Sequence, residues 1–453
     1  MRLTWIHPED LIGHELRQAR QDGRAVEAIA RRWHDAGGHD APPMAGASPE
    51  PAPERLRRLA EDLLDELATI PSPLADREPT GLDAVISACP DWPGAPLAAP
   101  GPDLAGRLRG AWAGRAAGCV LGKPVEKIPR EGIRAIAEAT GNWPIRGWFT
   151  ARGLPDDVAE RWPWNRRSAP TSLAENIDGT PEDDDLNFPM LALALLERYG
   201  TGFGTDDVAQ MWLDELPAGR IFTAERVALR NLLVGLASPE TAVYRNPFRE
   251  WIGALIRADV YGWVNPGDPA RAAVLAHRDA ALSHTANGVY GAMFAAALAA
   301  MSLTANGPEE VLAGALRVVP PESRLAVAVR EAADLARAEG DFERVLDALH
   351  ARHADLHWVH SVNNAAAVAA ALVHGAGDFS ASVTSVVSAG WDTDSDGATV
   401  GSVAGGLLGA DGIPDQWTAP LHNRVASTLT GFNGATFDTL AARTHALVQE
   451  TSG

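Results

Sequence analysis

Four consecutive acidic residues, Glu182-Asp183-Asp184-Asp185, stand directly before the apolar helical pattern LNFPMLALALLERYG. Between Glu175 and Asp185 the chain carries six carboxylates and no basic residue. One acid at a helix start is enough to cap free backbone N–H groups and to interact with the helix dipole. Neighbouring carboxylates raise each other's pKa unless a cation compensates them, and Mg²⁺ and Ca²⁺ take oxygen ligands of this kind. The run is therefore either a helix cap or one half of a metal site.

A second acidic turn, DTDSDG at residues 392–397, precedes the small-residue stretch ATVGSVAGGLLG. Its alternating oxygen ligands resemble the opening of an EF-hand loop, but the twelfth position is Val403, where that loop needs a bidentate Glu. Two interpretations remain, a helix N-cap turn or half of a metal site at a helix N-terminus. The Gly and Thr residues around the turn favour the metal site, because they permit sharp turns that direct several oxygens at one point.

A third segment, GRAAGCVLGKPVE at residues 114–126, superficially resembles a phosphate-binding loop. The spacing is wrong, and Pro124 follows Lys123 at the position where Ser or Thr binds Mg²⁺ in such loops. The pattern instead predicts a helix that ends at Gly122 and whose small residues permit close packing. Glu126, just beyond this helix, is either a solvated surface residue or a site residue.

Helical patterns that would position these turns recur throughout the chain after residue 103. We predict helices over residues 104–117, 186–199, 205–214, 222–236, 270–284, 288–302, 308–317, 323–338, 342–353, 362–374, 378–388, 396–408 and 435–449. Glycine and proline breakers separate them, and no convincing run of alternating β-branched residues indicates a strand. The expected fold class is all-α, a compact multi-helix bundle.

The first hundred residues differ in composition, because Pro-rich connectors separate their helical patterns. Residues 1–38 and 54–70 show helical spacing of apolar residues, and the Pro/Ala-rich stretch DAPPMAGASPEPAPE lies between them. A Pro/Gly-rich segment, PDWPGAPLAAPGPD, ends at Asp103. We therefore predict two parts, a helical N-terminal extension with Pro-rich linkers over residues 1–103 and a main domain over residues 104–453.

A segment rich in Trp, Pro and Gly, residues 142–185, has only weak periodicity. A long loop within a compact domain is usually either functional or disordered. Its tryptophans favour a functional loop.

The composition narrows the possible partners. The chain has 453 residues with 59 Asp and Glu against 39 Lys and Arg, a formal net charge of −20. This acidity disfavours nucleic acid as the main partner and disfavours anionic membrane surfaces. The two cysteines, Cys89 and Cys119, exclude a disulfide framework. The N-terminal sequence MRLTWIHPED lacks a signal-peptide pattern and no apolar run is long enough to span a bilayer, so we expect a cytoplasmic protein.

Taken together and in this order, the acidic and Gly-rich segments resemble the ADP-ribosylglycohydrolase family, all-α hydrolases that remove ADP-ribose from proteins or small molecules. The family's N-terminal signature, G-D-x-x-G-x-x-x-E, reads GCVLGKPVE here, with Glu126 at the Glu and Cys119 in place of the Asp. The family's T-D-D-T turn corresponds to residues 182–185. Its C-terminal D-x-D-[TS] turn corresponds to Asp392, Asp394 and Ser395.

Two further stretches also look like the family, LSHTANGVYGAMFAAALAA and HSVNNAAAVAAALVHGAGDFSASVTSVVSAGWDTDSDGATVGS. The resemblance therefore covers residues 104–449. It identifies the main domain as ADP-ribosylglycohydrolase-like.

The resemblance implies a binuclear Mg²⁺ site that cleaves the glycosidic bond of an ADP-ribosylated small molecule or protein. By motif position, the metal ligands are Glu182, Asp183, Asp184, Asp392, Asp394 and Ser395. Two Mg²⁺ ions would orient the ribose diol and activate a water that attacks the anomeric carbon. Glu126 would assist proton transfer or position the substrate, so the expected catalytic residues are Glu126, Asp183 and Asp394.

The resemblance also places Ser283 and His284 beside the diphosphate or ribose pocket. A single His after an apolar helix is more often a structural residue, which is the alternative for His284. Trp391 and the tryptophans of residues 142–164 are either surfaces for stacking on a base or parts of the core.

Three departures from the family pattern indicate a divergent branch with a changed substrate. Glu182 and Asp185 replace the two Thr residues of the family's turn, and Cys119 replaces a supporting carboxylate. The register of the acidic run also allows a shift by one residue, which makes Asp185 a ligand. The alternatives are a hydrolase of another ribosylated small molecule or nucleoside, or a non-catalytic binding protein. The linkage that is cleaved and the oligomeric state are left open.

Overall fold

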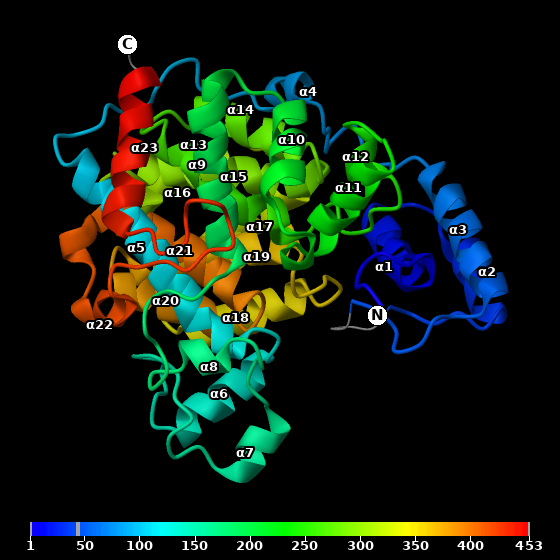
Figure 1. Ribbon diagram of the computed structural model, residues 1–453, viewed down its shortest axis with the longest axis horizontal. Helices are drawn as coiled ribbons and strands as arrows, with labels where there is room; N and C mark the ends of the chain where they lie inside the picture. Colours follow the sequence, from blue (N-terminus) through cyan, green and yellow to red (C-terminus); the bar gives the residue numbers. More distant parts are fainter. Residues whose placement is uncertain (1, 42–45, 452–453) are drawn as a thin grey trace.

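The computed structural model describes residues 2–41 and 46–451, and its regular elements are helices (Figure 1). Within these ranges the only β-type pairings are isolated bridges, such as the one between Thr180 and Val425. The predicted all-α fold class is therefore confirmed.

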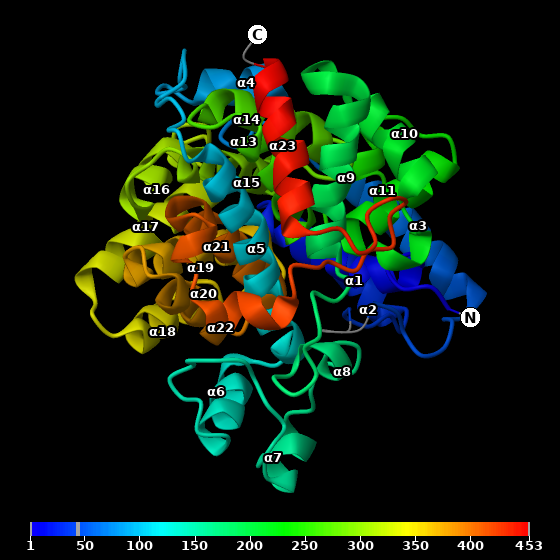
Figure 2. The same cartoon turned by 60° about the vertical axis from the view of Figure 1, so that its left-hand side comes forward.

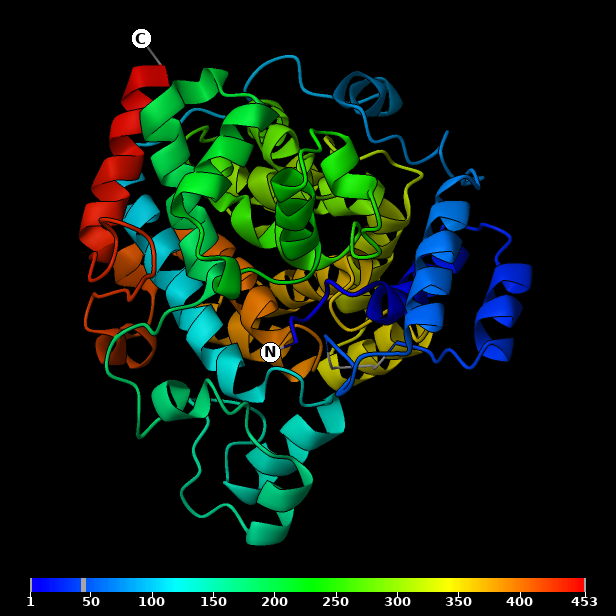
Figure 3. The ribbon, with the colours of Figure 1, turned by 45° about the vertical axis from the view of Figure 1, so that its right-hand side comes forward.

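The described residues of the N-terminal extension form the helices α1 (Pro8–Gln21), α2 (Glu27–Asp35), α3 (Glu54–Ala68) and α4 (Leu82–Ala88). Helices α1 to α3, blue in Figure 3, lie together on one flank of the molecule. Their apolar faces pack on one another, as the periodicity of residues 1–38 and 54–70 predicts. Residues 42–45 of the Pro/Ala-rich connector lie outside the described residues.

The remaining helices include all those predicted. They are α5 (Leu104–Gly122), α6 (Arg130–Ala139), α7 (Asp156–Arg161), α8 (Ala169–Ser172), α9 (Asp184–Tyr199), α10 (Thr205–Glu215), α11 (Thr223–Leu233), α12 (Glu240–Val243), α13 (Asp259–Trp263), α14 (Pro269–Ala280), α15 (Ala286–Ser302), α16 (Pro308–Leu316), α17 (Arg324–Ala338), α18 (Phe342–Arg352), α19 (Ser361–Gly375), α20 (Phe379–Ser388), α21 (Thr393–Leu408), α22 (Asp415–Thr418) and α23 (Phe437–Thr451). Of these, α6, α7, α8, α12, α13 and α22 are additional to the prediction.

Helices α5 and α21 form the closest pair in the fold and lie side by side in Figure 1 and Figure 2. Glycines at every fourth position face each other across this pair. A Cβ atom at Gly118 would lie 1.8 Å from the backbone oxygen of Gly397, and one at Gly114 would lie 2.2 Å from that of Gly401. Only glycine permits such a close approach of two backbones. The pair therefore sets the end of α5 beside the start of α21.

Helix α15 lies at the centre of the bundle, and its residues from Asn287 to Ser302 are all buried. Neighbouring helices surround it on every side, among them α13, α14, α16 and α21. A helix that is apolar all round needs such surroundings. No helix of the described residues combines the length and the apolar character needed to cross a membrane.

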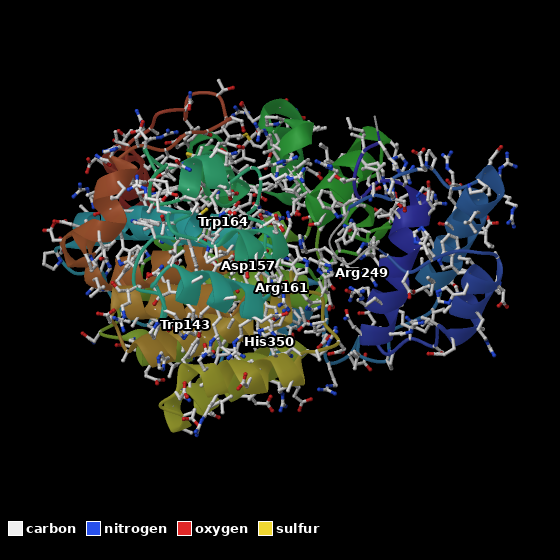
Figure 4. All side chains as sticks on the ribbon, turned by 90° about the horizontal axis from the view of Figure 1, so that it is seen from below. Trp143, Asp157, Arg161, Trp164, Arg249 and His350 are labelled. Atoms are coloured by element: carbon white, nitrogen blue, oxygen red, sulfur yellow. The ribbon has the colours of Figure 1, made fainter. Side chains whose placement is uncertain are left out.

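Helices α6, α7 and α8 form a lobe at the lower edge of Figure 1. The segment 142–185, expected to be a long loop, contains α7 and α8. Its tryptophans pack within the lobe or against the body. Trp148 donates a hydrogen bond from Nε1 to the backbone oxygen of Gln416 at 2.8 Å and contacts Trp417 edge-on. Trp143 and Trp164 are seen on this lobe in Figure 4.

Buried ion pairs join the extension to the rest of the chain. Arg249 donates hydrogen bonds to Glu15 and Asp22 of the extension, both at 2.7 Å. Arg324 pairs with Glu78 at 2.6 Å. Figure 4 shows Arg249 where the blue helices meet the body. Because a buried charge without its partner is costly, these pairs fix the position of the extension.

Candidate active site

Three segments that are far apart in the sequence meet at one place. They are the C-terminal end of α5 with the 3₁₀ turn Lys123–Val125, the N-terminus of α9 and the N-terminus of α21. The Thr393 hydroxyl donates a hydrogen bond to the backbone oxygen of Gly122 at 2.9 Å, and the Ser395 hydroxyl donates one to Asp185 at 3.3 Å. The segments singled out in the sequence therefore lie side by side.

Their acidic side chains form two groups in which the ligand atoms lie within 4.8 Å of one another. The first acidic group consists of Cys119, Asp183 and Asp185. The second acidic group consists of Glu126, Asp392 and Asp394.

The first acidic group already has cationic partners. The buried Lys123 forms an ion pair with Asp183. The fully buried Arg115 donates from Nε to the backbone oxygen of Asp185 at 2.7 Å and pairs with Asp259 at 2.8 Å. Burial opposes the charge on Asp183, but the ammonium of Lys123 outweighs it and holds the pKa of that carboxyl below its usual range.

Asp183 also acts as the helix cap that the sequence allowed. Its Oδ1 accepts a hydrogen bond from the backbone N–H of Asp185 at 2.9 Å. Burial and the charge of Asp183 raise the pKa of Asp185, although Arg115 opposes this shift. Burial, with Asp183 nearby, also raises the pKa of the Cys119 thiol. The third member of this group is therefore a neutral thiol.

The second acidic group lacks comparable compensation. Asp392 is the N-cap residue of α21, but its side chain accepts no capping hydrogen bond. Burial, then the charge of Asp394, raises the pKa of Asp392 well above its usual value. Burial, then the charge of Glu126, raises the pKa of Asp394 to about 7. Asp184 lines the same cavity, and burial, then the charges of Asp183 and Asp394, raises its pKa. Such mutual repulsion is relieved by a cation.

Glu126 is oriented by two neighbours that approach its carboxylate from outside the acidic groups. Asn165 donates a hydrogen bond from Nδ2 to Oε2 at 2.6 Å, and the half-exposed Lys127 pairs with Oε1 at 2.9 Å. Glu126 is thus a partly buried residue with a defined orientation.

Glu182, by contrast, turns its carboxylate toward other partners. Asn187 donates a hydrogen bond to Oε1 at 2.8 Å, and Arg220 pairs with Oε2 at 2.9 Å. Both oxygens of this predicted ligand are therefore engaged. Asp183 and Asp185 belong to the first acidic group, and Asp184 lines the same cavity. This arrangement is compatible with the alternative register, in which Asp185 is a ligand.

The acidic residues line a cavity of about 560 Å³. The N-terminal extension contributes Thr4, Trp5 and His14 to its wall, and four arginines also line it, Arg166, Arg167, Arg220 and Arg226. Arg226 lies over the Trp5 ring at 5.3 Å from its centroid. Trp251 and His357 stack on each other at 4.2 Å between centroids. The cavity therefore combines carboxylates, guanidinium groups and aromatic surfaces.

Ser283, His284 and Trp391 lie outside the wall of this cavity. Ser283 and His284 are fully buried behind Glu225, and the Ser283 oxygen lies 2.8 Å from Nδ1 of His284. Trp391 stacks on His350 with centroids 4.4 Å apart. Core packing accounts for all three positions, so their contact with a substrate stays a prediction from the resemblance.

Sequence reasoning missed several residues of the site. Lys123 lies within the quoted signature, but its contact with Asp183 depends on the side-chain direction at the end of α5. Asn165 and the adjacent Arg166 and Arg167 lie in the Trp-rich segment, whose composition gave the one available signal. Trp5 gave no signal, because the fold alone brings it to the cavity.

A family model described as ADP-ribosylglycohydrolase matches residues 100–452. One solved structure, described as an ADP-ribosylglycohydrolase-related protein complex, is 22% identical in sequence. That comparison covers 77% of this chain and 98% of the other, with a TM-score of 0.46. None of the curated proteins matches this sequence.

Proposed function

Because this chain belongs to the ADP-ribosylglycohydrolase family and is therefore a glycosidic hydrolase, we propose that it cleaves the glycosidic bond of an ADP-ribosylated substrate with the help of Mg²⁺. The proposed catalytic residues are Glu126, Asp183 and Asp394. The family acts on ADP-ribosylated substrates and is typically metal-dependent. That this chain cleaves the glycosidic bond of such a substrate, and that its metal is Mg²⁺, are parts of the proposal.

The observation that carries this proposal is that one cavity contains both a cluster of carboxylates and guanidinium groups that have no acidic partner. Among the described residues, Arg166, Arg167 and Arg226 have no acidic side chain as a partner. Burial, then the nearby charge of Arg167, lowers the pKa of Arg226. In a chain with a net charge of −20, unpaired cations on a cavity wall favour an anionic ligand. Guanidinium groups bind phosphate oxygens well, and a diphosphate offers several.

The second acidic group fits a hard divalent cation. Its three members and Asp184 offer carboxylate oxygens. The side chain of Asp392 accepts no hydrogen bond from the N-terminus of α21, so its oxygens are not occupied by capping. Mg²⁺ held there would supply positive charge that orients the ribose hydroxyls and acidifies a nucleophilic water. The resemblance predicts two Mg²⁺ ions held between the turn at residues 182–184 and the turn at residues 392–395. Lys123 already contacts the first group.

The protein's own groups account for positioning and proton transfer. Asn165 and Lys127 orient Glu126 at the edge of the acidic site, where a carboxylate accepts a proton from an attacking water. The carboxylates of the second group lie close enough to stabilise an oxocarbenium-like transition state. Asp183, capping α9 and paired with Lys123, holds the α9 turn in place.

We also propose that the chain has two parts, with the catalytic domain over residues 104–453 and the extension over residues 1–103 as part of the substrate pocket. Trp5 and His14 line the cavity although they lie outside the residues matched by the family model. A pocket wall supplied by an added segment supports a substrate that differs from those of other members.

The test is release of ADP-ribose by the purified full-length chain from a panel of Arg-linked, Ser-linked and small-molecule ADP-ribosyl compounds. We expect release from at least one compound with Mg²⁺ and none with EDTA. Release that EDTA leaves unchanged, or no release from the whole panel, contradicts the proposal. Nucleosides in the same panel test the alternative of another ribosylated substrate.

A matched pair of variants tests the anion site. Arg167→Gln removes an unpaired cation from the cavity, so KM should rise about tenfold, the loss expected for one charge-assisted hydrogen bond. Arg161→Gln removes an arginine on α7 that lies over Trp162 and does not line the cavity. Figure 4 shows Arg161 on the lobe. Equal KM values for the two variants would argue against the anion site.

A further inference from the structure

A lysine lies inside the acidic site. The chain has two lysines, Lys123 and Lys127, and the first is buried at the end of α5. Its ammonium forms an ion pair with Asp183 and lies 3.4 Å from the backbone oxygen of Glu182. An ammonium that contacts a buried carboxylate neutralises the charge that a metal ion would otherwise neutralise.

The first acidic group does not fit a divalent cation. Asp183 is paired with Lys123, and the Asp185 carboxylate accepts hydrogen bonds from the Ser395 hydroxyl at 3.3 Å and from Nη2 of Arg115 at 3.5 Å. The remaining member, Cys119, is a thiol, whereas Mg²⁺ prefers oxygen ligands. The ammonium of Lys123 is therefore the cation that compensates this group, and Asp183 becomes available to a metal ion when that ammonium is removed.

The second acidic group has the opposite balance. Glu126, Asp392 and Asp394 lie together, and Asp184 lines the cavity beside them. Among the described residues, Lys127 is the one cation that forms an ion pair with a member, and it does so at the half-exposed edge through Glu126. Three carboxylates thus remain without a cationic partner of their own.

We infer that Lys123 takes the place of one of the two metal ions, so that this chain binds a single divalent cation, in the second acidic group. The inference rests on the proposed function for the presence of that ion. It assigns to Lys123 the role of a built-in positive charge that also holds Asp183 in position. Lys123 is in this sense a positioning residue.

The experiment counts bound ions and does not depend on turnover. The full-length chain is dialysed to equilibrium against Mn²⁺ alone, and separately against Mg²⁺ alone, and the bound metal is measured by mass spectrometry. We expect one ion per chain in the wild type. Lys123→Met removes the ammonium but keeps an apolar side chain of similar length. It frees Asp183, which with the remaining lone pairs of Asp185 offers oxygen ligands to a cation, so this variant should bind two ions.

The second lysine of the chain supplies the matched control. Lys127→Met also removes an ammonium from the cavity wall, but it frees no carboxylate of the first group, so it should bind one ion. Lys123→Arg keeps the charge and should also bind one ion, which preserves the test if Lys123→Met fails to fold. In crystals soaked with Mn²⁺, the wild type should give one anomalous peak, next to Asp394, and none next to Asp183.

Two ions in the folded wild type, or one ion in folded Lys123→Met, would overturn the inference. The failure of the proposed function has a different signature. If the wild type binds two ions and releases ADP-ribose, the inference about Lys123 is wrong but the proposed function stands. A wild type that binds no ion and releases no ADP-ribose contradicts both.

Discussion

The two acidic groups of the site contain similar residues but differ in how their charges are compensated. In the first group, Lys123 and Arg115 contact Asp183 and Asp185, and the pKa of Asp183 is lowered despite its burial. In the second group, burial and neighbouring carboxylates raise the pKa of Asp394 to about 7. The number of acids in a turn therefore does not tell where a cation is needed, because internal cations decide it.

The difference originates in helix α5. Arg115 and Lys123 lie two turns apart on this helix and its continuation, and both reach α9. The turn that begins α21 contacts α5 through the Thr393 hydroxyl and the backbone oxygen of Gly122. Among the described residues, neither Arg115 nor Lys123 forms an ion pair with an acid of this turn. One helix thus neutralises one group and leaves the other open.

The largest expected effect comes from removing a charge in the second group. Asp394→Asn should lower Mg²⁺-dependent activity at least about 1,000-fold, because the bound ion supplies several kcal/mol of transition-state stabilisation. Its Mg²⁺ affinity, measured by calorimetry, should fall as well. If Asp394→Asn keeps full activity, the second acidic group is not the one that needs a cation.

The same substitution in the first group should have the opposite effect on the metal-free fold. Asp394→Asn relieves repulsion and should raise the Tm of the EDTA-treated protein at pH 8. Asp183→Asn leaves Lys123 buried without its partner and should lower that Tm. Equal signs for the two shifts would contradict the comparison.

Next in size is the loss of the buried arginine. Arg115→Met leaves Asp185 and Asp259 without their cation, and breaking a buried pair costs about 3–5 kcal/mol. Denaturant unfolding measures this loss of free energy. Arg109→Met on the same helix is the control, since Arg109 pairs with the exposed Asp438 and should change the unfolding free energy by less than about 1 kcal/mol.

The pH dependence should follow Asp394. Since its pKa is raised to about 7, a proton must leave before a cation binds. The dissociation constant for Mg²⁺ should therefore fall by at least about tenfold per pH unit up to about pH 7. In the metal-free protein the folded state holds this proton where the unfolded state has lost it, so stability falls as pH rises from about 4 to about 7. Calorimetric titration from pH 5.5 to 8.5 measures the slope, and a flat profile contradicts it.

The smallest effect is expected at Cys119. Because its thiol is neutral and soft, Cys119→Ala should change the Mg²⁺ dissociation constant by less than about twofold. Asp392→Ala is the comparison in the same buffer, and it should weaken Mg²⁺ binding because it removes a carboxylate of the second acidic group. A large loss for Cys119→Ala would make the first acidic group a metal site.

Much of the fold was predictable because helix formation is a local property. The spacing of apolar residues gave the helices of the main domain to within a few residues, and Gly122 was correctly expected as the end of α5. Helix α6 was missed, and so were the short helices α7, α8, α12, α13 and α22, since four to six residues carry too little periodicity. The meeting of the acidic turns was predictable through the family resemblance and not through spacing.

The sequence by itself determined the all-α class, the family and the acidic turns that bear the chemistry, because each is recorded in nearby residues or in a motif. Only the tertiary structure decided which acids have partners. Lys123 and Asp183 are 60 positions apart, and their contact depends on the side-by-side glycine faces that set the ends of α5 and α21. The same holds for Trp5, which reaches the cavity through the buried ion pairs of Arg249. Charge compensation is a property of distance in space, and a sequence records only distance along the chain.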